Sequence, residues 1–141
     1  MTDWVAWFRY QLKASADGFE LAFSQIPPAF LDQFPPDPGY LGTWTPARHV
    51  WHVTEYERCL ALPAMFQWLD PSAPSELPWP DDAETWALVQ ERGLGVLSAQ
   101  FRRIRQQQIN LLDQLTTVDW DGPRETLWGR KPLSMVVTKT F

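Results

Sequence analysis

The sequence predicts an all-α fold: a four-helix bundle in one domain, residues 1–141, with long crossover loops and an incomplete fourth helix. Three observations lead to this prediction. Apolar residues recur at steps of three and four along three long segments, which is the periodicity of one helix face. Proline-rich stretches that lack this periodicity separate the segments. A chain of 141 residues is also long enough to bury a core of its own.

Composition narrows the classes of function. The net charge is −5, and the only basic cluster is Arg102-Arg103-x-Arg105, which we place on a solvated helix face; nucleic-acid binding is therefore not expected. No signal peptide and no apolar run long enough for a membrane span occur. The single cysteine, Cys59, cannot form an internal disulfide, so we expect a reducing compartment, the cytoplasm. The chain has nine tryptophans and eight phenylalanines, which predict an aromatic-rich core. Some of these side chains could line a pocket.

The first helix is expected over residues 3–26. Thr2 or Asp3 can cap it, and Pro27-Pro28 end it. Residues 29–34 are compatible with one further turn, and residues 35–42 (P-P-D-P-G-Y-L-G) are expected to form a loop. The apolar stripe of the helix consists of Val5, Phe8, Leu12, Ala16, Phe19, Phe23 and Ile26.

The second helix is expected over residues 45–69, with Thr45 as N-cap and a proline at the first helical position. Pro63 lies inside it and predicts a kink or break near Leu60. Both histidines of the chain fall on one predicted stripe, so we expect them to face the core. A histidine in such a place is more often a hydrogen-bonded core residue than a ligand, and the spacing is not the i,i+4 of a zinc-binding pair. The stripe consists of His49, His52, Tyr56, Cys59, Pro63 and Phe66.

The second half of the chain is expected to form one more long helix and the start of another. After a loop at 70–80, Asp81 or Asp82 should cap a short helix that reaches residue 92, and Gly93 and Gly95 interrupt it. Residues 116–129 are polar and turn-like. A fourth helix begins near Pro132 and stops at residue 141, so we expect a truncated product or a fragment. The long helix is expected over residues 96–115. Its apolar stripe consists of Leu97, Phe101, Ile104, Gln108, Leu111 and Leu115. The one polar member, Gln108, either faces a cavity or, as we favour, forms a hydrogen bond with a polar group in the core.

The start of the second helix carries a family resemblance. Trp44, Thr45 and Pro46 are followed by His52, eight positions after the tryptophan, and then by Glu55. This pattern resembles the DinB-like (YfiT-like) family of four-helix metalloproteins. The resemblance implies His52 as a ligand of a divalent metal, zinc or nickel, in a thiol transferase or hydrolase. The family's other two ligands come from an H-x-x-x-H pair on helix four, which this chain lacks, so we expect its metal to be absent or weakly bound.

Two hypotheses of function follow. In a metal-dependent enzyme, Glu55 would orient the ring of His52 or act as a base, although a plain surface role for this carboxylate is favoured. Tyr56, Trp51 and Gln108 would shape the substrate cavity. The alternative is a non-catalytic bundle that binds a small-molecule thiol, an apolar ligand or a protein partner. Because the seam of three helices would be uncovered, we also expect a homodimer.

Overall fold

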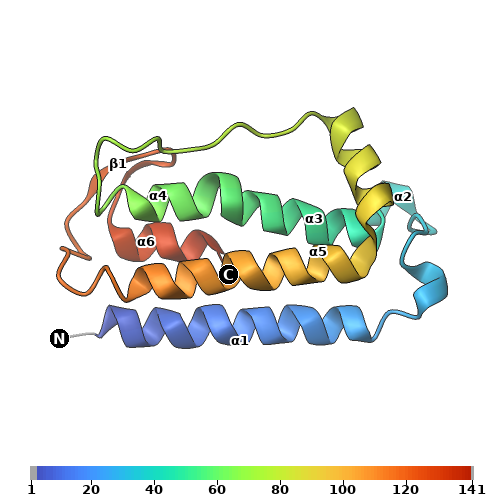
Figure 1. Ribbon diagram of the computed structural model, residues 1–141, viewed down its shortest axis with the longest axis horizontal. Coiled ribbons are helices and arrows are strands. Elements are labelled where there is room, and N and C mark those ends of the chain that lie inside the picture. The colour runs from blue at the N-terminus through green and yellow to red at the C-terminus, as the bar shows by residue number, and fades with distance from the viewer. Residues whose placement is uncertain (1–2, 141) are drawn as a thin grey trace.

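A computed structural model describes residues 3–140 and confirms the all-α bundle. Three helical rods run alongside one another, and a short fourth helical segment packs at one end (Figure 1). The bundle elements are α1 (Trp4–Ser24), α3 (Pro46–Tyr56), η2 (Glu57–Ala61), α4 (Leu62–Phe66), α5 (Asp82–Leu112), α6 (Leu133–Val137) and η3 (Thr138–Thr140). The connections contain η1 (Pro28–Phe30), α2 (Pro38–Leu41), β1 (Arg124–Thr126) and β2 (Gly129–Lys131).

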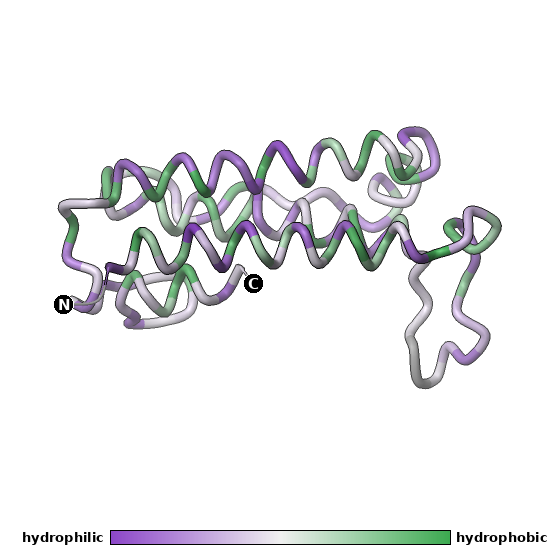
Figure 2. Tube along the Cα trace, turned by 90° about the horizontal axis from the view of Figure 1, so that it is seen from below, coloured by the Kyte–Doolittle hydropathy of each residue, from purple (hydrophilic) through white to green (hydrophobic). Residues whose placement is uncertain are grey.

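Helix α1 lies close to its predicted bounds. The carboxylate of Asp3 accepts a hydrogen bond from the backbone N–H of Ala6 at 3.0 Å, which satisfies one of the free donors of the first turn. Phe8 and Leu12 are buried on the face that packs against α5 and the C-terminal segment. Hydrophilic and hydrophobic stretches alternate along both α1 and α5 (Figure 2), as expected for helices with one face in the core.

The second rod begins as predicted and changes its helical type where a kink was predicted. Thr45 caps α3, since its hydroxyl accepts from the Arg48 N–H at 3.2 Å. The chain then passes through η2, a π-helical turn, instead of breaking. Pro63 has no N–H for the carbonyl of Cys59, and that carbonyl accepts from the N–H of Leu77 at 2.8 Å. The proline thereby frees an acceptor that anchors the segment after α4.

The prediction of which face of α3 is buried is wrong. His49 is exposed and His52 is only partly buried, so neither histidine belongs to the core. The side chains that pack inward are those of Ala47, Val50, Trp51 and Thr54, about a third of a turn away. Burying Val50 and Trp51 against α5 removes more apolar surface from water than burying two imidazoles would. The π-helical turn then shifts the register, so that Cys59 is buried although the histidines are not.

Helix α5 is continuous where two helices, separated near Gly93, were predicted. The side chain of Asp81 caps it by accepting from the N–H of Glu84 at 2.8 Å. At Gly93, φ is 71° and ψ is 165°, a conformation open almost only to glycine, and the helix kinks there into two limbs. All six residues of the predicted stripe, from Leu97 in the second limb to Leu115 just after the helix, are buried. Helix α5 packs against α1 and α3.

Two short regions expected to be irregular contain small regular elements. Residues 116–129 were predicted as turns, but β1 pairs with β2 antiparallel, with Glu125 opposite Arg130. Gly129, at φ 81°, supplies the left-handed residue that the tight hairpin needs. The loop at 35–42 similarly contains the four-residue helix α2. Elements of three or four residues are too short to display a periodicity, so the sequence pattern could not reveal them.

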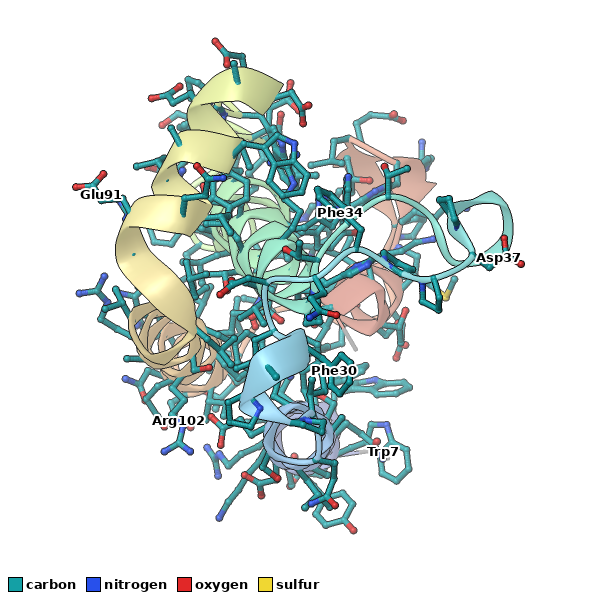
Figure 3. All side chains as sticks on the ribbon, turned by 90° about the vertical axis from the view of Figure 1, so that its right-hand side faces the viewer. Trp7, Phe30, Phe34, Asp37, Glu91 and Arg102 are labelled. Atoms are coloured by element: carbon teal, nitrogen blue, oxygen red, sulfur yellow. The ribbon has the colours of Figure 1, made fainter. Side chains whose placement is uncertain are left out.

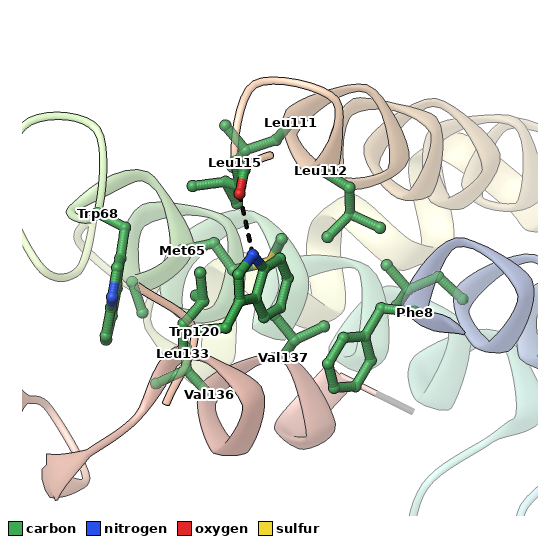
Figure 4. Packing of buried hydrophobic residues seen from close by; sticks show 12 residues of the cluster. Phe8, Met65, Trp68, Leu111, Leu112, Leu115, Trp120, Leu133, Val136 and Val137 are labelled. Carbon is green, nitrogen blue, oxygen red and sulfur yellow. Dashed lines mark hydrogen bonds between the residues drawn. The ribbon is translucent and has the colours of Figure 1, made fainter. Parts of the chain in front are cut away.

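The core consists of two clusters. At the α6 end, the indole N–H of Trp120 donates to the Leu115 carbonyl at 2.9 Å, and its ring stacks on Phe8 with centroids 5.5 Å apart (Figure 4). This cluster also receives Leu133, Val136 and Val137 of the last helix. The other cluster joins α3 to both limbs of α5 through Ala47, Val50, Trp51, Val89, Leu97 and Phe101. Within residues 3–140, no helix is both long and apolar enough to cross a membrane.

Candidate functional site

The histidine implicated by the family resemblance, His52, lies on the outer side of α3 among aromatic rings. Its ring centroid is 4.8 Å from that of Trp44 and 5.5 Å from that of Trp79. Partial burial lowers the pKa of His52, and the positive charges of Arg48 and His49 lower it further. The imidazole is therefore neutral at pH 7, the form that can accept a hydrogen bond or ligate a metal.

His52 borders a cavity of about 390 Å³ between α1, α3 and α5, closed at one end by η3. We call this cavity the His52 groove. Most of its accessible wall is apolar, although seven of its ten lining residues carry a polar side chain. The C-terminal end of the described chain lies about midway along the bundle, beside this region (Figure 1). The groove is lined by Ser15, Phe19, His52, Val53, Tyr56, Glu57, Phe101, Arg105, Lys139 and Thr140.

A buried ion pair contributes to the groove. Arg105 is only 4% exposed and pairs with Glu57, its Nε lying 3.1 Å from each carboxylate oxygen. The guanidinium also donates to the carbonyls of Leu12 at 2.7 Å and of Thr140 at 3.1 Å. It therefore holds α1, η2, α5 and η3 together. Burial raises the pKa of Glu57, and the hydrogen bonds and charge of Arg105 act in the opposite direction.

This placement corrects the expectation that the arginine cluster lies on a solvated face. Arg102 and Arg103 are exposed, but Arg105 is not. A signal was present in the sequence: Arg105 follows Phe101 by four positions and precedes Gln108 by three, so it lies on the edge of the apolar stripe. Glu57 follows Val50 and Thr54 at helical spacing and so lies on the buried face of this rod, but the sequence reasoning had placed the core on the face of the histidines.

Of the remaining predicted site residues, Tyr56 shares the groove with His52, and Glu55, Trp51 and Gln108 do not. Glu55 is buried, contrary to the surface role that was favoured, and its carboxylate pairs with Arg58. Tyr56 lines the His52 groove as predicted, and burial raises its pKa. Trp51 instead lines a different cavity, on the other side of α3. Gln108 is 0% exposed, and neither polar atom of its amide has a hydrogen-bond partner among the described residues.

The described residues do not fit a transition-metal site. Within residues 3–140 there is no group of three or more histidine, cysteine, aspartate or glutamate side chains that could hold an ion, and tight sites need three or four protein ligands. The thiol of Cys59 is buried, and burial above all raises its pKa to about 11, so it stays protonated at neutral pH.

A buried arginine that the sequence reasoning missed lies beside His52. The Arg48 guanidinium carbon lies 5.0 Å from the ring centroid of Trp44, 5.7 Å from that of Trp51 and 4.9 Å from that of Trp86. It also pairs with Asp82, which fastens the first limb of α5 to α3. Trp44, Arg48 and Trp51 are spaced four and three residues apart, so one side of the helix start already indicated this cation–π cluster.

Comparison with known proteins agrees with the fold and the resemblance. The family model of the DinB superfamily matches residues 11–137, from the third turn of α1 to the end of α6. The chain matches no curated protein and no solved structure at a significant level. A match over that range includes the W-T-P start of α3 and His52. The chain therefore belongs to the DinB superfamily.

Proposed function

We propose that this chain is a non-catalytic, ligand-binding helical bundle, and that the His52 groove receives the ligand. The observation that carries the proposal is the groove itself: an open, mostly apolar cavity of about 390 Å³ with a neutral imidazole at its border. Phe19, Val53 and Phe101 supply apolar walls for a small organic molecule. His52 and Tyr56 supply hydrogen-bonding groups that would orient a thiol or hydroxyl of such a ligand.

A titration with 2-naphthol, which carries an apolar ring and one hydroxyl, tests this proposal by NMR. We expect chemical-shift changes at the backbone amides of Val53, Tyr56 and Phe101. Val53→Trp should fill the groove and abolish them, whereas Val96→Trp, at an exposed site on α5, should leave them unchanged. Shifts that map outside the groove, or that survive Val53→Trp, would overturn the proposal.

The second candidate function is the metal-dependent thiol transferase or hydrolase that the family resemblance implies. The lowered pKa of His52 favours it, because a neutral imidazole is ready to ligate zinc or nickel. The donor set described above does not complete such a site. Metal-dependent activity would thus need ligands that residues 3–140 do not bring together.

We expect calorimetric titration with Zn²⁺ or Ni²⁺ to show no tight one-to-one binding to this chain. One or two imidazoles give a weak site, since each missing ligand removes a metal–protein bond. His52→Ala should therefore leave the weak heat signal nearly unchanged. Tight stoichiometric binding that His52→Ala removes would instead establish a metal centre and restore the enzyme as the leading function.

We also propose that the chain forms a homodimer in a reducing compartment, the cytoplasm. Support for a dimer comes from the outer face of α1, where Trp7 and Tyr10 are 52% and 68% exposed and Trp7 points away from the bundle (Figure 3). The free thiol of Cys59 fits a reducing location.

Light scattering during size exclusion should give about twice the 16.4 kDa mass of one chain. The double variant Trp7→Glu/Tyr10→Glu should give monomers, because two charges on the contact face would have to be desolvated. Val96→Glu, another exposed apolar position, provides the control and should remain dimeric. A monomer of the unaltered protein at high concentration would contradict the dimer.

A further inference from the structure

A second concave region lies beside the crossover segment, residues 67–81, which connects α4 to α5 (Figure 1). One cavity of about 690 Å³ lies between α4, this segment and α5, and another of about 590 Å³ lies between α3, the segment and both limbs of α5. Arg58, Arg103 and Ile104 line both cavities. The two cavities therefore adjoin at these residues, and we call them together the crossover channel. It is separate from the His52 groove.

The crossover segment is tethered where it covers the channel. The Leu77 N–H donates to the Cys59 carbonyl at 2.8 Å, as described above, and the Cys59 sulfur lies 3.6 Å from the Pro78 carbonyl oxygen. The side-chain amide of Gln67 donates to the Ala73 carbonyl at 3.0 Å. The contacts to Cys59 fasten residues 77–78 of this proline-rich segment to η2, and the Gln67–Ala73 bond braces the segment internally near its start. The crossover segment thus lines one side of the channel, and the helices line the others.

One end of the channel is apolar and in part exposed to water. Leu62 and Pro63 of α4 and Leu111 of α5 face this cavity together with Phe66 and Leu77. Phe66 is 40% exposed and Leu77 is 36% exposed. Large apolar side chains that remain accessible in a concave site gain free energy when an apolar ligand covers them. This end therefore suits a hydrocarbon chain.

The other end carries an excess of cationic groups. Arg58 is neutralised by Glu55, with its Nε 3.1 and 3.0 Å from the two carboxylate oxygens. Arg92 donates to the uncharged amide of Gln100 at 3.1 Å and has no ion pair with any residue from 3 to 140. Within residues 3–140, Arg103 has neither an ion pair nor a side-chain hydrogen bond, and it lies where the two cavities meet.

Among the described residues that line this end, Glu84 is the one carboxylate without a cationic partner. Two unneutralised arginines and one unneutralised glutamate leave an excess of one positive charge. A ligand with a single negative charge matches that excess, and a guanidinium binds a carboxylate through two parallel hydrogen bonds.

We propose that the crossover channel binds a medium-chain fatty carboxylate. The acyl chain lies at the apolar end against Leu62, Phe66 and Leu111, and the carboxylate pairs with Arg103 at the junction. Trp79 lines the charged end, so its fluorescence should change when a ligand occupies the channel. The proposal concerns residues that do not line the His52 groove and holds or fails independently of that site.

Calorimetry with decanoate on the whole chain, below its micelle concentration, tests the proposal. We expect saturable one-to-one binding that Arg103→Gln weakens about tenfold, since a charge-assisted pair is lost. Arg102→Gln is the matched control: its guanidinium pairs with Glu20 on α1, away from the channel, so decanoate affinity should not change. Decanol, which has the same chain without the charge, should bind more weakly and be insensitive to Arg103→Gln.

A second variant tests the apolar end without disturbing the core. Phe66→Asp places a negative charge beside the acyl chain at a partly exposed position and should abolish decanoate binding while the circular dichroism spectrum is retained. Equal weakening by Arg102→Gln and Arg103→Gln would reveal general attraction to surface charge and overturn the proposal. The absence of saturable decanoate binding, or binding that displaces the 2-naphthol probe from the His52 groove, would overturn it as well.

Discussion

Replacing Arg105 with methionine is expected to lower the free energy of unfolding by about 3–5 kcal/mol, because the carboxylate of Glu57 would remain buried without its partner. The loss should be larger than for an ordinary surface ion pair, since the guanidinium also satisfies the carbonyls of Leu12 and Thr140. Urea denaturation followed by tryptophan fluorescence measures the change, with the slope of the transition as a check on compactness.

The double variant Arg105→Met/Glu57→Met distinguishes the loss of the ion pair from the cost of leaving one buried charge without a partner. Removing both charges avoids the unpaired buried carboxylate, so most of the lost stability should return. Arg102→Met serves as the control, because its ion pair with Glu20 is at the surface and should contribute about 1 kcal/mol or less. If Arg105→Met alone were as stable as the parent protein, the buried pair would not hold the four segments together.

Replacing Gln108 with methionine is expected to raise the free energy of unfolding by about 1–3 kcal/mol. The amide is fully buried and neither of its polar atoms has a hydrogen-bond partner in the part of the chain that the structure describes. Such a group loses its bonds to water on folding and regains none, whereas an unbranched thioether of similar volume has nothing to lose. Thermal and urea unfolding of the two proteins would measure the gain.

The neighbouring Gln107 supplies the control for that experiment. It is exposed, so Gln107→Met should change stability by less than about 0.5 kcal/mol. A loss of stability in Gln108→Met would contradict the prediction and show that the amide is satisfied, for instance by a buried water. The same result would support the earlier preference for Gln108 as a residue that bonds a polar core group.

Much of the helical framework was predictable because its signals are local. The N-caps Thr45 and Asp81 act on donors three residues away, and the break at Gly93 follows from a backbone conformation that other residues avoid. The stripe of α5 was predicted correctly because five apolar residues and Gln108, at steps of three and four, leave one possible buried face. The W-T-P motif and His52 likewise indicated the family, and the family match confirms that assignment.

The site was harder to predict, because the face of α3 is decided by its partners. The sequence offers two overlapping stripes on this helix, one through His49 and His52 and one through Val50 and Trp51. Only the packing of α5 against the second shows which one is buried. The burial of Glu55 has the same origin, whereas its ion pair with Arg58, three residues further on, is local to the helix.

The sequence alone determined the all-α class, the caps, the kink at Gly93, the irregular turn before Pro63 and the family, because each depends on groups within a few residues of one another or on a short motif. The tertiary structure decided that His52 borders the groove between α1, α3 and α5, that Arg105 and Glu57 meet across the core, and that two cavities join beneath residues 67–81. The two residues of the ion pair are 48 positions apart, and the channel is lined by residues of α3, η2, α4, α5 and the crossover segment. Burial and charge pairing at such separations depend on how whole helices pack, which no local pattern encodes.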